Sequence, residues 1–271
     1  MRSVRGAGLE LALVDEGEGP AVLMLHGFPD TAQLWRHQVR ALVSAGRRAI
    51  APDMRGRGGS ERPSSVEAYA IPHSVADMVA VLDALGLDRV DVVGHDFGAI
   101  VAWAMAAQHP ERVSRLVAMS VGHPATFRER TVADREMAWY QLLFQFEGVA
   151  EELLQRDDWR LFREWLRDPG DVDEYIADLS RPGALTAGLN WYRANLAPQL
   201  ELQPRPPLPP VAAPTMGLWS SGDNYLPEHR MVRSEEHVTG PWRYERVEDA
   251  SHWLQLDAPD RVNELLLDFL G

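Results

Sequence analysis

The segment Val92–Ala99 reads Val-Val-Gly-His-Asp-Phe-Gly-Ala and contains Asp96, the residue best placed to do chemistry. This Gly-x-Asp-x-Gly pattern follows the apolar run Val90–Val93 and precedes the helix-like run Ala99–Gln108. A sharp turn between a strand and a helix holds one side chain clear of the backbone, and flanking glycines leave room for the turn. A serine at this point would attack esters, whereas a carboxylate attacks an sp³ carbon and forms an ester with it. Carbons that accept this attack carry a strained ring oxygen or a halide.

Two later residues complete a charge system in the chain order nucleophile, acid, base. Asp223 follows the expected strand Thr215–Trp219, and His252 follows the expected strand Trp242–Val247. This order is that of an α/β-hydrolase, and active sites of such sheets collect beyond the carboxyl ends of the strands. We therefore expect His252 to act as base and Asp223 to orient it. Asp249 is a rival orienting acid, but its short loop to His252 would have to fold back sharply.

The segment His26-Gly27-Phe28-Pro29 follows another expected strand and supplies a further part of such a site. The backbone N–H groups of Phe28 and Phe97 would form an oxyanion hole. The alternative interpretation of this segment is a plain turn from strand to loop.

Other polar motifs are interpreted as structural. The Gly-rich loop 53–60 lacks lysine and the spacing of a phosphate-binding loop. His95 and His123 are expected to be hydrogen-bonded packing residues. We predict no metal site, because no cluster of histidines and acids has a suitable spacing.

The first half of the chain alternates strand-like and helix-like segments, which is typical of a mostly parallel sheet covered by helices. An early edge hairpin is expected where Leu9–Val14 turns at Gly17–Pro20. The other expected strands are Ala21–Leu25, Arg48–Pro52, Val90–Val93, Val113–Val121, Thr215–Trp219 and Trp242–Val247. The expected helices are Thr31–Ser44, Ser74–Leu85, Ala99–Gln108 and Pro259–Phe269.

The pattern changes to purely helical between Arg128 and Ala197, a stretch that holds ten aromatic residues. A proline-rich connector then leads back to the sheet pattern. We predict an α/β-hydrolase core formed by residues 1–127 and 206–271, interrupted by a helical cap over residues 128–205. A cap inserted beside the turn at Asp96 would cover the active site.

Composition excludes several classes of function. The formal charge of −13 argues against nucleic acid or an anionic membrane as a partner. The chain has no cysteine and no lysine, which removes thiol chemistry, disulfides and Schiff-base chemistry. No apolar stretch approaches the roughly 20 residues needed to span a bilayer. With no signal-peptide pattern either, we expect a cytoplasmic protein.

Together these motifs resemble the α/β-hydrolase-fold epoxide hydrolases over nearly the whole chain. The matching landmarks are the segment His26–Pro29, the loop 53–60, the turn around Asp96, Gly222-Asp223 and Ser251-His252-Trp253. Haloalkane and haloacetate dehalogenases share most of them, so the landmarks indicate the superfamily rather than the reaction.

Two tyrosines favour the epoxide hydrolases. The segments around Tyr140 and Tyr192 resemble those that carry the two cap tyrosines of that family. The resemblance implies that their phenols hold and protonate the ring oxygen, which a phenol of pKa about 10 suits. Dehalogenases bind the halide or the carboxylate with side chains after the nucleophile, and Phe97 offers no such donor. The resemblance places the substrate among neighbouring residues, namely Trp139, Phe144, Trp191, Trp253 and Pro29.

The expected activity is therefore hydrolysis of a small apolar epoxide by water, without a cofactor, in a monomer or homodimer. The alternatives are a dehalogenase with the same nucleophile, an esterase or lactonase in which a carboxylate activates water, and an inactive small-molecule-binding protein on this scaffold. The sequence leaves open the natural substrate, its regio- and stereoselectivity, and a role in detoxification or biosynthesis.

Overall fold

A mostly parallel sheet forms the centre of the computed structural model, which describes residues 2–128, 130–167, 171–204 and 206–271. The strand order in this described part is β1-β2-β4-β3-β5-β6-β7-β8, in which β2 runs antiparallel to both β1 and β4 and the other neighbouring pairs are parallel. The strands are β1 (Arg2–Arg5), β2 (Glu10–Glu16), β3 (Ala21–Leu25), β4 (Arg48–Pro52), β5 (Val90–His95), β6 (Val113–Met119), β7 (Thr215–Ser220) and β8 (Trp242–Val247).

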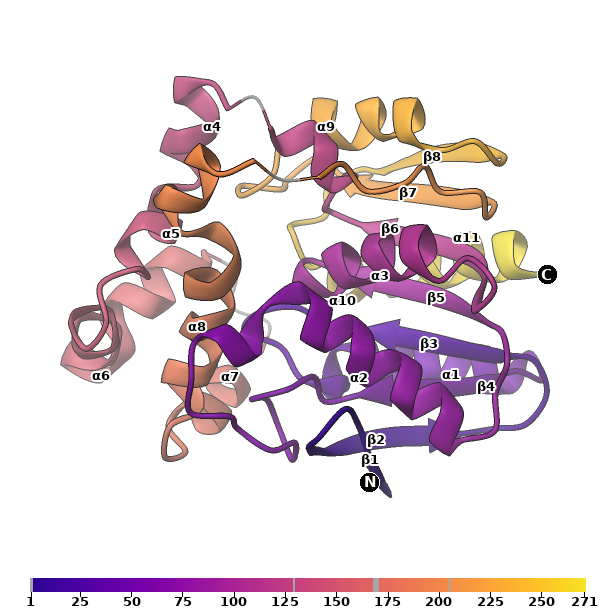
Figure 1. Ribbon diagram of the computed structural model, residues 1–271, viewed down its shortest axis with the longest axis horizontal. Helices are drawn as coiled ribbons and strands as arrows, with labels where there is room; N and C mark the ends of the chain where they lie inside the picture. Colours follow the sequence, from indigo (N-terminus) through magenta and orange to yellow (C-terminus); the bar gives the residue numbers. More distant parts are fainter. Residues whose placement is uncertain (1, 129, 168–170, 205) are drawn as a thin grey trace.

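Helices cover both faces of the sheet (Figure 1). On one face α2 (Ile71–Ala84) packs against α3 (Phe97–Gln108), and on the other α1 (Arg36–Ser44) packs against α11 (Pro259–Leu270). Strands covered on both sides are mostly apolar, and every residue of β3, β5 and β7 is buried. The prediction of a mostly parallel sheet flanked by helices is confirmed.

Short helices occupy the loops at the carboxyl ends of the strands and at the chain's turns. They are η1 (Ala32–Trp35), η2 (Glu67–Tyr69), η3 (Pro124–Phe127), α9 (Glu228–Val232), η5 (Arg233–His237) and α10 (Leu254–Asp257).

The expected early hairpin is wrong in its pairing. The chain does turn at Gly17 and Gly19, both at positive φ, but β2 pairs with β1 and β4 rather than with β3. The reason lies in the patterns of the two segments. The uniformly apolar β3 fits between two parallel neighbours, whereas β2 alternates between buried and exposed residues and suits a place nearer the edge.

A group of helices lies beyond the carboxyl ends of the parallel strands (Figure 1). We call residues 132–202 the inserted helices. They comprise α4 (Val132–Met137), α5 (Trp139–Leu143), α6 (Val149–Leu166), α7 (Val172–Leu179), α8 (Ala184–Leu196) and η4 (Pro198–Leu202). The expected boundary at residue 205 lies outside the described residues.

Ion pairs tie the inserted helices to the rest of the molecule. Arg36 of α1 contacts Asp171 before α7 at 2.6 Å, and the buried Arg230 of α9 contacts Asp134 of α4 at 2.6 Å. Asn195 of α8 accepts a hydrogen bond from the Ile71 N–H and donates one to the Tyr69 carbonyl. Partly buried pairs of this kind fix orientation, which matters for helices that face a site.

No helix in the described ranges combines the length and the apolar character that crossing a membrane requires.

Candidate active site

The turn from β5 to α3 holds Asp96 in a strained conformation. Its φ of 53° lies in a region that residues with a Cβ rarely adopt. The turn is possible because its neighbours are glycines. A Cβ on Gly98 would lie 2.0 Å from the Leu25 carbonyl oxygen, and one on Gly94 would lie 2.4 Å from the Gly98 carbonyl oxygen. The Gly-x-Asp-x-Gly pattern is thus explained by the close packing of the backbone at Gly94 and Gly98.

The structure brings Asp96, His252 and Asp223 together from three strand ends. The His252 Nδ1 atom lies 2.8 Å from Asp223 Oδ2, and its Nε2 atom lies 3.7 Å from Asp96 Oδ2. Asp223 Oδ1 accepts hydrogen bonds from the N–H groups of Tyr225 and Leu226. With both carboxylate oxygens engaged, Asp223 is fixed and aligns the imidazole.

Asp249, the rival acid, is exposed, and the Asp223 carboxylate occupies the position beside His252 Nδ1. Of the two acids, Asp223 therefore stays the predicted orienting residue of His252.

Charge couples His252 to both acids. Burial lowers the pKa of His252, but the charges of Asp223 and Asp96 and their hydrogen bonds raise it to about 10. Burial raises the pKa of Asp96, but the hydrogen bond and charge of His252 outweigh it and hold that pKa below its ordinary value. At neutral pH the imidazolium therefore lies between two carboxylates. Loss of the Asp96 charge would remove one cause of the high pKa of His252.

One predicted oxyanion-hole donor already contacts the nucleophile. The Phe28 N–H donates to Asp96 Oδ1 at 3.0 Å. Phe97 is the first residue of α3, where backbone N–H groups have no acceptor within the helix. His26 holds the preceding loop, since its Nε2 accepts from the Met54 N–H and its Nδ1 lies 2.8 Å from the Gly27 carbonyl oxygen. Burial lowers the pKa of His26 to about 4, so this link stays neutral.

Tyr140 of α5 and Tyr192 of α8 face the same cavity as Asp96. Both are buried, and their ring centroids lie 5.9 Å apart. Burial raises the pKa of both phenols, which keeps them protonated and able to donate. Aromatic rings pack edge-on around them. Phe97 and Phe144 each lie 4.9 Å from the Tyr192 ring, and Trp165 lies 4.9 Å from the Tyr140 ring.

A buried ion pair fixes the helix that carries Tyr192. Arg193 donates to both oxygens of Glu151 at 2.9 Å and to the Phe144 carbonyl at 2.9 Å. These bonds join α8 to the end of α5 and the start of α6. The two tyrosines are therefore held at a set spacing by the packing of the inserted helices.

The cavity above Asp96 has a volume of about 330 Å³ and mostly apolar walls. It takes residues from α2, α3, η3, α5 and α8 and from the loops after β6, β7 and η4. The aliphatic and aromatic side chains on its wall, besides the tyrosines, are Ile71, Pro72, Phe97, Ile100, Val121, Phe127, Leu196, Leu208 and Leu226. Sequence reasoning missed most of them, since only their common cavity distinguishes them from ordinary core residues.

The five residues expected to contact substrate lie around this cavity rather than on its wall. Phe144 is fully buried behind the tyrosines, and the indole N–H of Trp191 donates to the Arg55 carbonyl. Trp253 donates to Asp30, and the Pro29 carbonyl accepts from Arg57. Trp139 is 46% exposed and lines a different cavity. None of the five lines this cavity, and their contact with substrate stays a prediction.

Asp30 is a buried acid that the sequence analysis did not single out. Its Oδ2 accepts from the Trp253 indole at 3.2 Å and lies 4.0 Å from His95 Nδ1. The His95 Nε2 atom in turn lies 2.9 Å from the His252 carbonyl oxygen. Burial raises the pKa of Asp30 to about 7. Its position directly after Pro29, next to the segment expected to form the oxyanion hole, is the sequence feature that could have identified Asp30.

The other polar motifs have packing contacts. In the loop 53–60, Asp53 accepts from the N–H groups of Ala32 and Gly59. The His123 Nδ1 atom accepts from the Ala125 N–H. Among the described residues, no group of histidines and acids has an arrangement that could hold a metal ion.

Comparison with known proteins gives the family. Residues 20–259 match the model of the alpha/beta hydrolase fold. The chain is 36% identical to Epoxide hydrolase A of Mycobacterium tuberculosis over 99% of this chain and 96% of that protein. It is 32% identical to Epoxide hydrolase 3 of Xenopus tropicalis over 98% of this chain and 76% of that protein.

The chain belongs to the epoxide hydrolases of the α/β-hydrolase fold.

Solved structures agree with this family. Epoxide hydrolase A of Mycobacterium thermoresistibile superposes with a TM-score of 0.83 at 34% identity, covering 99% of this chain and 97% of that one. An epoxide hydrolase of Bacillus megaterium, determined with an inhibitor, superposes with a TM-score of 0.90 at 28% identity over 99% of both chains. The predicted family and fold are thereby confirmed.

The charge coupling predicts a pH dependence of stability. The pKa of His252 is raised from 6.5 to about 10 in the folded protein, so its contribution is fully present below pH 6.5 and is lost as pH rises to about 10. We expect the unfolding free energy of the native protein to fall over this range relative to His252→Asn, which lacks the titrating group. Urea unfolding of both proteins at a series of pH values measures the difference, and parallel pH profiles would contradict the charged triad.

Proposed function

We propose that this protein hydrolyses epoxides to vicinal diols through an ester between the substrate and Asp96. The observation that carries the proposal is a carboxylate at the nucleophile position, with a side chain only 15% exposed, in one cavity with two buried, protonated tyrosines. Membership of the epoxide hydrolase family supports the same reaction.

In the first step, Asp96 Oδ2 attacks a ring carbon while the bond between that carbon and the ring oxygen breaks. The ring oxygen develops negative charge and takes a proton from the phenol of Tyr140 or Tyr192. The positioned hydroxyls of the two tyrosines stabilise this charge, and the mostly apolar wall of the cavity strengthens that interaction. The product of this step is an ester of Asp96 that carries a neighbouring hydroxyl.

In the second step, His252 becomes a base. Ester formation removes the Asp96 charge, so the pKa of His252 falls and the imidazole releases a proton, which restores the phenol. The neutral imidazole then takes a proton from a water molecule whose oxygen attacks the ester carbonyl carbon. The N–H groups of Phe28 and Phe97 stabilise the oxyanion on Oδ1. The bond between the carbonyl carbon and the alkyl oxygen then breaks, and that oxygen takes the proton left on the attacking oxygen. This restores the Asp96 carboxylate, releases the diol and leaves His252 protonated as at the start.

The substrate we propose is a small apolar epoxide, in keeping with the apolar wall of the cavity. In this proposal the inserted helices are the cap domain, water is the second substrate, and the chain's own side chains supply all the chemistry. The protein acts as a monomer or a homodimer, without nucleic acid or membrane as a partner.

A product assay tests the proposal. The purified protein is given an aryl epoxide, a haloalkane and fluoroacetate separately, and diol and halide are both quantified. We expect diol from the epoxide and no halide from the other two. Halide without diol would contradict the proposal and favour a dehalogenase.

Substitutions separate the two steps. Asp96→Ala should abolish diol formation, because no ester can form. His252→Gln should still open the ring and accumulate alkylated protein, visible by mass spectrometry as an increase equal to the epoxide mass. Asp249→Asn, which changes the exposed rival acid, is the matched control and should turn over normally. Normal turnover by His252→Gln would contradict the two-step scheme.

Removal of either phenol should slow ring opening. We expect Tyr140→Phe and Tyr192→Phe each to reduce the rate of alkylation by about ten- to hundredfold, the usual size of general acid catalysis. Stopped-flow measurement of the first step gives this rate. Tyr244→Phe is a suitable control. Tyr244 lies on the edge strand β8, on the other side of the sheet from β1, and its hydroxyl contacts Glu228. Unchanged alkylation in both single variants would contradict the role of the tyrosines.

A further inference from the structure

We propose that the substrate carries an anionic group, of which a carboxylate is the model, and that Arg130 recognises it at the mouth of the catalytic cavity. This inference rests on the proposed function and specifies its substrate class: an apolar chain with the epoxide at one end and a negative charge toward the other.

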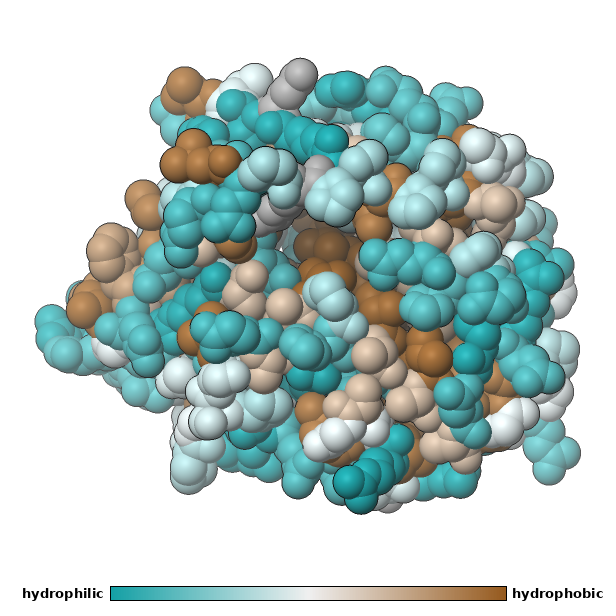
Figure 2. All heavy atoms as spheres, viewed as in Figure 1, coloured by the Kyte–Doolittle hydropathy of each residue, from teal (hydrophilic) through white to brown (hydrophobic). Residues whose placement is uncertain are grey.

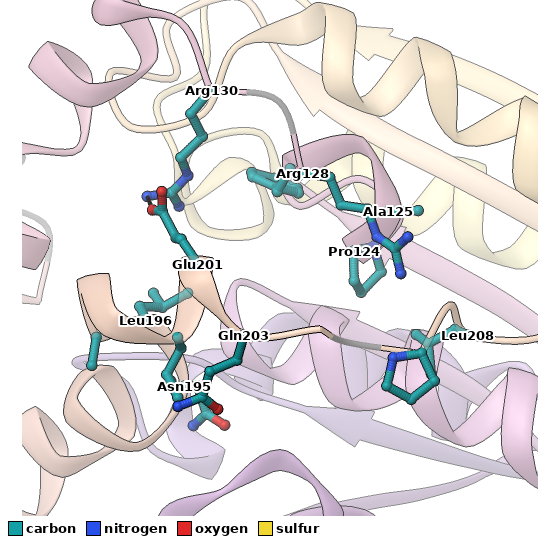
Figure 3. A pocket seen from close by; sticks show the side chains of 13 residues that line it. Pro124, Ala125, Arg128, Arg130, Asn195, Leu196, Glu201, Gln203 and Leu208 are labelled. Atoms are coloured by element: carbon teal, nitrogen blue, oxygen red, sulfur yellow. Dashed lines mark ion pairs between the residues drawn. The ribbon is translucent and has the colours of Figure 1, made fainter.

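A second cavity continues from the catalytic one toward the surface. It has a volume of about 460 Å³, and Figure 3 shows the residues that line it. Figure 2 shows a hollow with hydrophobic side chains at its floor on the same face of the molecule. The residues shared by the two cavities are Pro124, Phe127, Arg130, Asn195, Leu196 and Leu208. A ligand can therefore extend from Asp96 into the outer cavity.

The polarity of this path changes along its length. Apolar side chains such as Ile100, Phe127 and Leu196 surround the inner part and suit a hydrocarbon chain. Among the described residues that line both cavities, Arg130 alone carries a charge. Arg128 and Gln203 add polar groups to the outer cavity. A ligand that fits this path is apolar near Asp96 and anionic where it meets Arg130.

The Arg130 guanidinium is only partly neutralised by its neighbours. Its side chain is 15% exposed and donates to Gln141 Oε1 at 3.1 Å. The nearest carboxylate belongs to Glu201, at 3.7 Å, and Figure 3 shows the two side chains pointing toward each other. The same carboxylate lies closer to the exposed Arg135, at 2.9 Å. Burial lowers the pKa of Arg130, which indicates that an additional anion would stabilise its charge.

This local charge differs from that of the whole molecule. The chain carries a formal charge of −13, so its surface repels anions at long range. Screening limits that repulsion to about 8 Å at physiological ionic strength. A partly buried arginine acts inside this distance and pairs with a carboxylate through two parallel hydrogen bonds. Arg130 can thus select an anion that the rest of the surface does not attract.

A structural role is the rival explanation for Arg130. Its bond to Gln141 lies next to Tyr140, so the guanidinium also holds the helix that carries a proposed catalytic phenol. The two roles differ in what they predict. Loss of a structural bond impairs every substrate alike, whereas loss of an anion site impairs only substrates with a charge.

The test compares terminal epoxy fatty acids of increasing chain length with their methyl esters. At the best chain length, we expect the native protein to have a higher kcat/KM for the acid than for the ester. Arg130→Gln should lower kcat/KM for the acid by about ten- to hundredfold, mainly through KM, since a charged hydrogen bond contributes this much. The ester should change by no more than about twofold. Arg130→Lys keeps the charge and should recover part of the preference.

Arg135→Gln is the matched control, because Arg135 contacts the same Glu201 but lines neither cavity. It should leave the ratio of acid to ester unchanged. An equal loss for acid and ester in Arg130→Gln, or a native protein that prefers the ester at every chain length, would overturn the inference. If esters and an aryl epoxide give no diol either, the proposed function itself fails, and the two failures are thereby distinguished.

Discussion

The placement of buried His252 between the carboxylates of Asp96 and Asp223 is the interaction on which the rest of the structure depends. Removing one of the three charges leaves the others without compensation, which costs several kcal/mol when they are shielded from water. All three side chains must therefore be held in fixed relative positions, although they come from separate parts of the chain. Parallel strands accomplish this, because β5, β7 and β8 end at the same edge of the sheet. The loops after them then need to span only short distances to join Asp96, Asp223 and His252.

A mostly apolar surrounding strengthens the effect of these charges, and the inserted helices form part of it. The cavity is bordered by α5 and α8 and by α2, α3 and η3. Electrostatic interactions are stronger away from water, so a single change in the charge of Asp96 is felt strongly by His252. The contacts of Arg193 and Asn195 keep α8 in place while this happens. Stability and proposed chemistry thus use the same packing.

The parts predicted from sequence were those with a local physical signature. Mostly apolar runs identified β3, β4 and β5 to within two residues, and glycine spacing identified the turn at Asp96. The short, mostly exposed β1 carries no such run and was not predicted. The cavity wall and Asp30 also escaped, because a side chain's direction is set by tertiary packing. The sequence suggested Trp191 and Trp253 as substrate contacts, but their indole N–H groups donate to the Arg55 carbonyl and to Asp30.

Oxygen labelling during a single turnover tests the central claim most directly. Excess protein is mixed with an epoxide in ¹⁸O-labelled water, and the diol and the peptide that contains Asp96 are analysed by mass spectrometry. If the ester forms and water attacks its carbonyl carbon, the first diol takes its new oxygen from Asp96 and is unlabelled, while the Asp96 peptide gains ¹⁸O. Labelled diol with an unlabelled peptide would show direct attack of water on the ring and would contradict the account.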